Sequence, residues 1–586
     1  SQQLVHQAVL AQLPIDIQLP KDFQGWVKSP IVWLTLGFIF IVFLNLAPSK
    51  SKVKLANSSW GGSAEIAKAR RKAKKQIANP TRNKVTLYLN LDEDVRARTE
   101  AFWEKIGWQN PVKVVPKKRE KGEAKPTPDK KIPTFYLPDA QRGIYVGGAA
   151  GSGKSFTSAD PLYRSAVDQG FPLVLYDFKY PEQSQRIAAY AAARGYQVEV
   201  FAPGFEESCT CNPMHFIKDE NDSIAAAQMA KTINANTNLE GGKKEEFFEN
   251  AGNAILEGIL LLTKAVPRLL VNLDPQTFAD AEGMPNEYAQ SFDDLITAQY
   301  LLALPDVAKR LAQAQAQGII AGWMGIPFQQ AVSVKEAEKT ISSIVATASA
   351  VFRGFIRRDF VTALIGKTNI HQRIEGKKLM IFGLDNINRD VVSPILASIL
   401  HMTVRNNIYG KVKRNDPLIV GLDEIATMRL PSLVNWLAEG REMGFCGILG
   451  VQLFNQLEKT YGKEIARTIF GNCATKFIFN PQENEAAKMF SDMLGETEIT
   501  YYTKGNSSSS SKGGGSSGRS RTQHRTKKHL FEPAQFTRLK TGRCVVINPN
   551  YERGEEAYLP ILQSIKIRQE EIAHQQWSVD NWDTLR

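Results

Sequence analysis

The sequence predicts an α/β fold with a parallel sheet, an inserted all-helical region and one membrane-spanning helix near the N-terminus. Three observations support this: short apolar runs alternate with helical segments, residues 214–355 lack strand signals, and residues 31–47 carry no charge. Alternating strands and helices are typical of parallel sheets, because each crossover lays a helix on the sheet. The 586 residues exceed what a single hydrophobic core usually supports, so at least two soluble domains are expected.

The expected strands fall into two groups separated by an insertion. They lie at residues 143–147, 171–179, 196–201, 378–384, 417–424, 445–452 and 475–479. The insertion, 214–355, divides one sheet domain into a first part, 134–213, and a second part, 356–586. Within it, helices are expected at residues 224–233, 245–265, 291–304, 306–317 and 334–353, because apolar residues recur there at helical spacing.

The C-terminal part contains a low-complexity segment. Residues 506–529 have six Lys or Arg and no acidic residue, and 505–529 is expected to be a disordered loop. A flexible surface loop is favoured over a segment that follows a phosphate backbone. Residues 531–562 predict a helix and a hairpin that close the sheet.

The membrane helix is predicted from Ile31–Ala47, whose length is just sufficient to cross the bilayer core. Residues 50–131 hold 22 Lys or Arg against 9 Asp or Glu. By the positive-inside bias, the bulk of the chain faces the cytoplasm and residues 1–30 form a short segment across the membrane. The chain is therefore predicted to cross a membrane in a single pass over residues 31–48.

Residues 49–133 are predicted to be a basic juxtamembrane region and linker. Helices are expected at residues 64–77 and after Leu91, with a strand at 85–89 and a solvated linker at 111–133. The lysines of this region are interpreted as facing lipid or solvent rather than nucleic acid. The five cysteines are sparse and predict reduced structural thiols, not a disulfide framework or a metal site.

The first chemical motif follows the strand at residues 143–147. Its eight residues are Gly148, Ala149, Ala150, Gly151, Ser152, Gly153, Lys154 and Ser155, followed by a helix-compatible stretch. Such a loop wraps phosphates with backbone N–H groups. Its lysine reaches the β- and γ-phosphates and its serine hydroxyl ligates Mg²⁺, so the motif predicts ATP and Mg²⁺ as cofactors.

The second motif is a pair of carboxylates after the strand that begins at Pro417. Asp423 is suited to hold Mg²⁺, together with Ser155, and Glu424 to deprotonate the attacking water. Gln452 ends the next strand and is placed to sense the γ-phosphate. Arg441 precedes that strand; it either stabilises phosphoryl charge in a neighbouring subunit or pairs with a surface carboxylate. Asp177 and Lys179 are either ligand-edge residues or ordinary polar residues at a strand end.

The order of these motifs resembles the type IV secretion coupling proteins of conjugation, membrane-anchored ATPases related to the FtsK and RecA motors. The likeness extends from GAAGSGKS through YDFK, EEFFENAG and LIVGLDEIATM to GREMGFCGILGVQLFNQLEKTYG and KTGRCVVINPN. It implies a RecA-like nucleotide-binding domain in a homo-hexamer. It also implies relaxase-bound single-stranded DNA, and possibly protein, as cargo for the secretion channel components. It further implies a bacterial inner membrane as the location. Members usually have two transmembrane helices, whereas one is predicted here.

Two other functions remain open from the sequence. One is a chromosome-segregating or pilus-assembly motor with the same core, and the helical insertion and single anchor count against the former. The other is a membrane docking adaptor that binds nucleotide without hydrolysing it. The presence of Lys154, Asp423 and Glu424 together argues against that adaptor.

Overall fold

The computed structural model describes residues 58–105, 129–237, 246–326, 345–346, 348–349, 352–511 and 514–585. The expected membrane helix at residues 31–47 and most of the expected linker at 111–133 lie outside these ranges. In the described part, none of the helices combines the length and apolar character needed to cross a bilayer. The chain divides into two compact units, one containing residues 498–527 and the other containing residues 58–497 and 528–586.

The larger unit is built on a nine-stranded sheet in the order β13-β12-β9-β3-β8-β7-β4-β6-β5. Neighbours from β9 to β5 run parallel, whereas β12 and β13 are antiparallel additions at one edge. The predicted parallel sheet is thus confirmed from β9 to β5, and the predicted closing hairpin supplies the two antiparallel strands. The strands are β3 (Ile144–Gly147), β4 (Leu173–Asp177), β5 (Gln197–Phe201), β6 (Lys378–Gly383), β7 (Leu418–Leu422), β8 (Phe445–Val451), β9 (Thr475–Ile478), β12 (Arg543–Ile547) and β13 (Ile561–Ser564).

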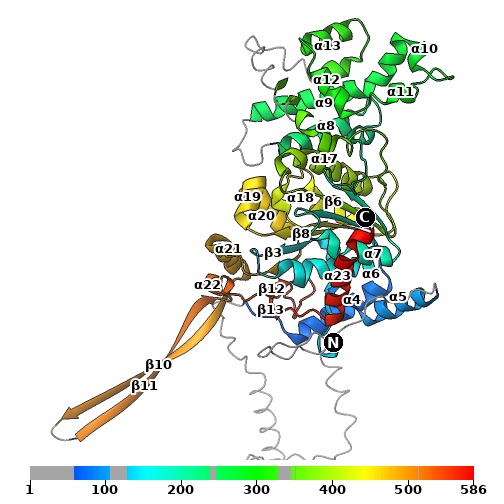
Figure 1. Cartoon of the computed structure of the whole chain (residues 1–586). Helices are drawn as coiled ribbons and strands as arrows, with labels where there is room; N and C mark the ends of the chain where they lie inside the picture. The colour runs from blue at the N-terminus through cyan, green and yellow to red at the C-terminus, as the bar shows by residue number, and fades with distance from the viewer. Residues whose placement is uncertain are drawn as a thin grey trace, which may run out of the picture. The chain divides into compact units, whose positions relative to one another are not determined.

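Helices cover both faces of the sheet (Figure 1). Successive strand residues point to opposite faces, so Leu173 and Leu175 belong to one buried core while Val174 and Tyr176 belong to the other. The first core includes α4 (Ser63–Ala78), α6 (Asp160–Asp168) and α7 (Ala188–Ala193). The second includes α8 (Ser223–Asn236), α9 (Glu246–Leu273), α17 (Arg389–Ile408), α18 (Leu433–Ala438), α19 (Phe454–Tyr461), α20 (Lys463–Asn472), α21 (Asn484–Leu494) and α22 (Pro533–Phe536).

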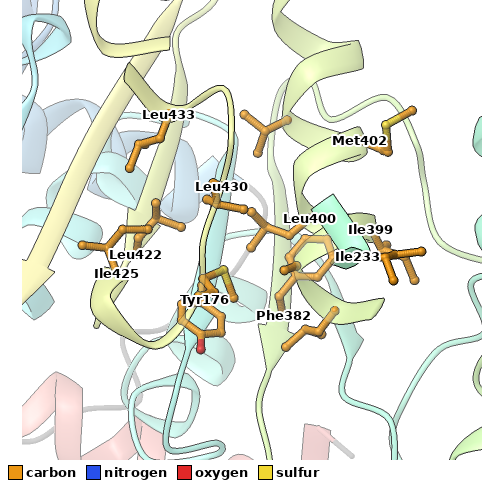
Figure 2. Packing of buried hydrophobic residues seen from close by; sticks show 14 of the residues in the cluster. Tyr176, Ile233, Phe382, Ile399, Leu400, Met402, Leu422, Ile425, Leu430 and Leu433 are labelled. Atoms are coloured by element: carbon orange, nitrogen blue, oxygen red, sulfur yellow. The ribbon is translucent and has the colours of Figure 1, made fainter. Parts of the chain in front are cut away.

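The second core is continuous from the sheet into the inserted helices. Figure 2 shows Phe382 of β6 and Tyr176 of β4 facing Leu400 of α17, with Ile233 of α8 beyond. The strand–helix alternation stops here because α8 packs on α17, and α9 packs on α8, rather than on the sheet. Further helices between β5 and β6 include α10 (Pro275–Phe278), α11 (Glu287–Gln290), α12 (Leu295–Leu302), α13 (Val307–Ala316) and α16 (Arg358–Val361).

The basic region before the phosphate motif contains the helices and the strand expected at residues 64–77, at 85–89 and after Leu91. Helix α4, strand β1 (Thr86–Leu89), helix α5 (Glu93–Lys105) and strand β2 (Phe135–Pro138) form a folded layer in which β1 and β2 pair antiparallel. Ala69, Ala73 and Ile77 are buried at four-residue spacing on α4, so the lysines and arginines occupy the other face. At the C-terminus, α23 (Gln569–Asp580) packs on α7, and α24 (Trp582–Leu585) follows it (Figure 1).

The expectation of a disordered loop at 505–529 is wrong for the residues described. Strands β10 (Glu496–Ser511) and β11 (Gly514–His529) form a two-stranded ribbon, orange in Figure 1. The composition argument failed because it counts apolar side chains available for burial, whereas a ribbon is held by backbone pairing between neighbouring strands. Cross-strand side-chain contacts add to this: Tyr501 stacks on His524 with ring centres 5.1 Å apart.

Candidate nucleotide site

The phosphate motif forms a tight loop between β3 and the helix that follows it. The Gly148 N–H donates to the Val451 carbonyl at 3.0 Å and the Ala149 N–H to the Asn480 carbonyl at 2.9 Å, fixing the loop to β8 and to the residues after β9. Gly151 and Gly153 have φ values of 75° and 92°, in the left-handed region that favours glycine. The loop shape therefore depends on these glycines.

Residues from the far C-terminal part of the chain support this loop. The Gly542 N–H donates to the Ser152 carbonyl at 2.9 Å, and the Thr541 hydroxyl donates to the Gly151 carbonyl at 3.2 Å. A side chain at Gly153 would have its Cβ 3.0 Å from the Gly542 nitrogen. The KTGR segment that precedes β12 is thus part of the site's framework.

Lys154 and Ser155 lie at the start of the helix that follows the loop. Its first turn, Ser155–Ala159, is π-helical and leads into α6. Lys154 is only 7% exposed. Burial lowers the pKa of its ammonium group, and the negative charges of Glu424 and Asp423 oppose that shift. The lysine and the two carboxylates are therefore close enough to interact, although about 270 residues separate them in sequence.

Asp423 and Glu424 follow β7 at the carboxyl edge of the sheet. The Gln452 backbone N–H donates to Glu424 Oε2 at 2.8 Å, so the end of β8 orients this carboxylate. Burial is the main cause that raises the pKa of Asp423 to about 7 and that of Glu424 to about 8. Gly450 is required beside them, because a Cβ there would lie 1.9 Å from the Asp423 carbonyl oxygen.

These elements enclose a cavity of about 260 Å³. Its lining residues are Ala149, Gly151, Gly153, Lys154, Ser155, Phe156, Phe178, Lys179, Glu182, Gln183, Arg186, Asp423 and Gln452. The structure therefore brings together the phosphate loop, Asp423 and Gln452, as the sequence predicts. Glu424 lies behind this lining and is 2% exposed.

A hydrogen-bonded network beside Asp423 was missed by sequence reasoning. The Gln183 amide donates to Asp423 Oδ1 at 3.3 Å and to Asp160 Oδ1 at 3.2 Å. Asp160 also accepts from Arg186 at 3.1 Å and from Gln575 of α23 at 2.9 Å. These residues form no motif in the sequence. The one feature that could have indicated them is that Gln183 and Arg186 follow the end of a strand, the edge at which such sheets bind ligands.

Asp177 has a structural role at that strand end. Its carboxylate accepts from the backbone N–H groups of Lys179, Gln183 and Ser184 at 3.2, 2.9 and 2.8 Å. It thereby fixes the turn that carries Gln183 to Asp423. Asp177 itself does not line the cavity. Lys179 and Gln183, whose backbone N–H groups it binds, do line it.

Three buried polar atoms at the site have no hydrogen-bond partner within the described part of the chain. They are Ser152 Oγ, Gln183 Oε1 and Glu424 Oε1. Buried polar atoms are nearly always paired, so such atoms suit a site whose partners arrive with a ligand. Loop N–H groups, an ammonium group, a serine hydroxyl and two carboxylates match a magnesium nucleotide.

Arg441 is not part of this cavity. It lies in the turn Gly440–Met443 before β8, whereas the cavity is at the other end of that strand. Its side chain is 44% exposed and its guanidinium is 3.9 Å from Glu442. Within one chain, the structure therefore does not bring Arg441 to Lys154.

Comparisons with known proteins agree with the resemblance seen in the sequence. Residues 417–541 match the family described as "TraM recognition site of TraD and TraG". Coupling protein TraD of Escherichia coli (strain K12) is 30% identical over 108 residues, which are 18% of this chain and 15% of that protein. The match thus spans a small part of the curated relative's length.

Solved structures extend the likeness to the fold. The unbound bacterial conjugative coupling protein TrwBdeltaN70 is 16% identical with a TM-score of 0.51, covering 78% of this chain and 92% of that one. TrwB in complex with ADP and Mg²⁺ is 17% identical with a TM-score of 0.50, covering 76% and 90%. The chain has the α/β fold of the conjugative coupling proteins, and its resemblance to that class is confirmed.

Proposed function

We propose that this chain is a membrane-anchored ATPase coupling protein. It would use ATP hydrolysis to recruit relaxase-bound single-stranded DNA, and possibly protein, and to move it into a type IV secretion channel. The observation that carries the proposal is the meeting of Lys154, Ser155, Asp423 and Glu424 at one edge of the sheet, around a cavity that fits phosphates.

The residues divide the catalytic work among them. Backbone N–H groups of the loop and the Lys154 ammonium bind the β- and γ-phosphates. Ser155 and Asp423 would hold Mg²⁺, which supplies charge neutralisation when bound. Glu424 takes the proton of the attacking water, a task suited to a carboxylate whose pKa burial has raised to about 8. Gln452 lines the cavity and contacts the γ-phosphate.

Arg441 acts in this proposal on a neighbouring subunit of a homo-hexamer. Its place at the opposite end of β8 from the cavity suits a group that reaches another chain's nucleotide rather than its own. A guanidinium supplied in trans stabilises the charge that spreads over the γ-phosphate oxygens during transfer.

The proposed partners follow from the resemblance. The match to a TraM recognition region and to TraD supports a role among DNA-processing proteins of conjugation. The proposed anchor is the uncharged stretch at residues 31–47, with the sheet domain on the cytoplasmic side of the inner membrane. Fractionation tests the anchor: the full chain should sediment with membranes and resist salt extraction, and release by salt alone would contradict it.

Hydrolysis assays with and without single-stranded DNA test the function. We expect ATP turnover that single-stranded DNA stimulates. Binding of ATP with no turnover under any DNA condition would favour a docking adaptor. Turnover that responds only to duplex DNA, or to no DNA, would favour another motor of the same fold.

A further inference from the structure

The β10–β11 ribbon has two chemically different faces. Alternate residues of a strand share a face. Two cross-strand contacts show which residues of β10 and β11 share a face. The Arg521 guanidinium lies 3.8 Å from the centre of the Tyr502 ring, and the Arg525 side chain lies 3.4 Å from that of Glu498. Lys504 and Arg519 continue the same alternation. We call Tyr502, Lys504, Arg519 and Arg521 the cationic face.

The charge of the outer ribbon has one sign. From Thr500 to Lys528 the chain contains seven Lys or Arg and no Asp or Glu. The two glutamates of the ribbon, Glu496 and Glu498, lie at its base. Lys504, Arg519 and Arg521 are all exposed. Such a surface attracts a polyanion, and each phosphate it neutralises releases counterions.

Tyrosines add a second kind of contact. Tyr502 on the cationic face is 48% exposed, and Tyr501 on the opposite face is 51% exposed. Tyr501 already stacks on His524. The guanidinium of Arg521, stacked on the Tyr502 ring, has its N–H groups available at the edge of the guanidinium plane. From there an arginine donates two parallel hydrogen bonds to a phosphate. An aromatic ring among phosphate-binding cations is typical of surfaces that bind single-stranded nucleic acid.

We propose that the cationic face binds a single DNA strand, with Lys504, Arg519 and Arg521 on phosphates and one unpaired base stacked on Tyr502. The stacking contact favours a single strand over a duplex, whose bases are already stacked, and over an anionic membrane, which offers no planar partner. The proposal deepens the proposed function, since it places a DNA contact outside the nucleotide cavity.

Fluorescence anisotropy of a labelled single-stranded oligonucleotide, titrated with the full chain at several salt concentrations, tests the phosphate contacts. For Arg519→Ala with Arg521→Ala, the slope of log affinity against log salt should fall by about 0.7 per lost contact. The matched control is Lys411→Ala with Lys413→Ala, which removes the same charge from exposed loop positions. Equal loss in both double variants would overturn the proposal.

A pair of tyrosine variants tests the stacking. Tyr502→Ala should weaken single-strand binding by about tenfold or more, while Tyr501→Ala should leave it nearly unchanged. Equal effects of the two substitutions, or equal loss on duplex DNA or phosphatidylserine vesicles, would overturn the assignment. ATP turnover without DNA should be normal in all ribbon variants, and Lys154→Ala should still bind the oligonucleotide, so failure here is distinguishable from failure of the proposed function.

Discussion

At the scale of single residues, Lys154 combines burial with a nearby pair of carboxylates. It is 7% exposed, and burial lowers the pKa of its ammonium group. A buried ammonium costs folding free energy unless it is paired. Its position is thus explained by the phosphates it serves rather than by packing.

Lys154→Ala should abolish ATP hydrolysis without unfolding the protein. Removing a charged donor of this kind lowers turnover by about 100-fold to 1,000-fold, and the melting temperature should be unchanged or higher. An ATPase assay and circular dichroism check both parts. Lys411→Ala is the control, because Lys411 is exposed and does not line the cavity. Near-normal turnover of Lys154→Ala would remove the loop from the mechanism.

Glu424→Gln should trap ATP. The amide can still accept the hydrogen bond from the Gln452 N–H, so the site keeps its shape. It cannot take a proton from water, so turnover should fall by at least about 100-fold while nucleotide affinity holds. Equilibrium binding and single-turnover kinetics separate the two quantities. If both fell together, Glu424 would be reassigned to metal binding.

At the scale of elements, helix α6 after the phosphate loop is joined to the C-terminal helix α23 by a buried ion pair. Arg164 lies 3.1 Å from Glu571, and their side chains are 4% and 5% exposed. Glu571 also accepts from the Leu91 N–H. The pair ties together three segments that are distant in sequence.

Arg164→Ala should destabilise the protein by about 3–5 kcal/mol, because it leaves the Glu571 carboxylate buried without its cation. Urea unfolding measures the change. The control is Lys68→Ala, whose pair with Glu552 is exposed (51% and 37%) and should contribute about 1 kcal/mol or less. A loss for Arg164→Ala no larger than for Lys68→Ala would show that the buried pair does not hold the helices together.

His401 makes the stability of helix α17 depend on pH. Burial, with Arg405 and Lys231 nearby, lowers its pKa to about 3. The unfolded chain binds a proton near the usual pKa of about 6.5, whereas the folded chain does not. Its contribution to stability is therefore complete above about pH 6.5 and is lost as the pH falls toward 3.

Between pH 6 and 4, the wild type should lose about 1.4 kcal/mol more per pH unit than His401→Leu. Urea midpoints of both proteins at matched pH values measure the difference. Parallel pH profiles would show that His401 becomes protonated without unfolding the helix.

At the scale of the whole molecule, the sheet order places the two motifs side by side. Strand β8 lies between β3 and β7, so the phosphate loop after β3 and the carboxylates after β7 flank the end of β8. The same order places Arg441, at the beginning of β8, away from its own cavity. A trans role therefore requires a second subunit.

Mixing Arg441→Ala subunits with Lys154→Ala subunits tests that role. Each variant should be inactive alone, whereas mixed hexamers should recover part of the activity at interfaces that join an intact loop to an intact arginine. Sedimentation verifies mixing. Full activity of Arg441→Ala alone, or no recovery in verified mixed hexamers, would contradict the trans assignment and favour the surface pair with Glu442, which contributes about 1 kcal/mol or less.

The sequence by itself determined the features that depend on residues close together in the chain. Strands appear as apolar runs, and the phosphate loop is one contiguous motif whose glycines meet a local backbone requirement. The Asp423–Glu424 pair was identifiable because it ends such a run. These features needed no knowledge of the tertiary fold.

The tertiary structure decided what depends on residues distant in sequence. Gln183 joins Asp160 to Asp423, and Gly542 supports Ser152, through contacts that no local pattern records. The ribbon at residues 496–529 was missed because backbone pairing, unlike burial, leaves no mark in composition. Hydrogen bonds and cross-strand pairs require two groups to be close in space. For residues distant in sequence, that closeness arises only when the chain folds and the strands pair.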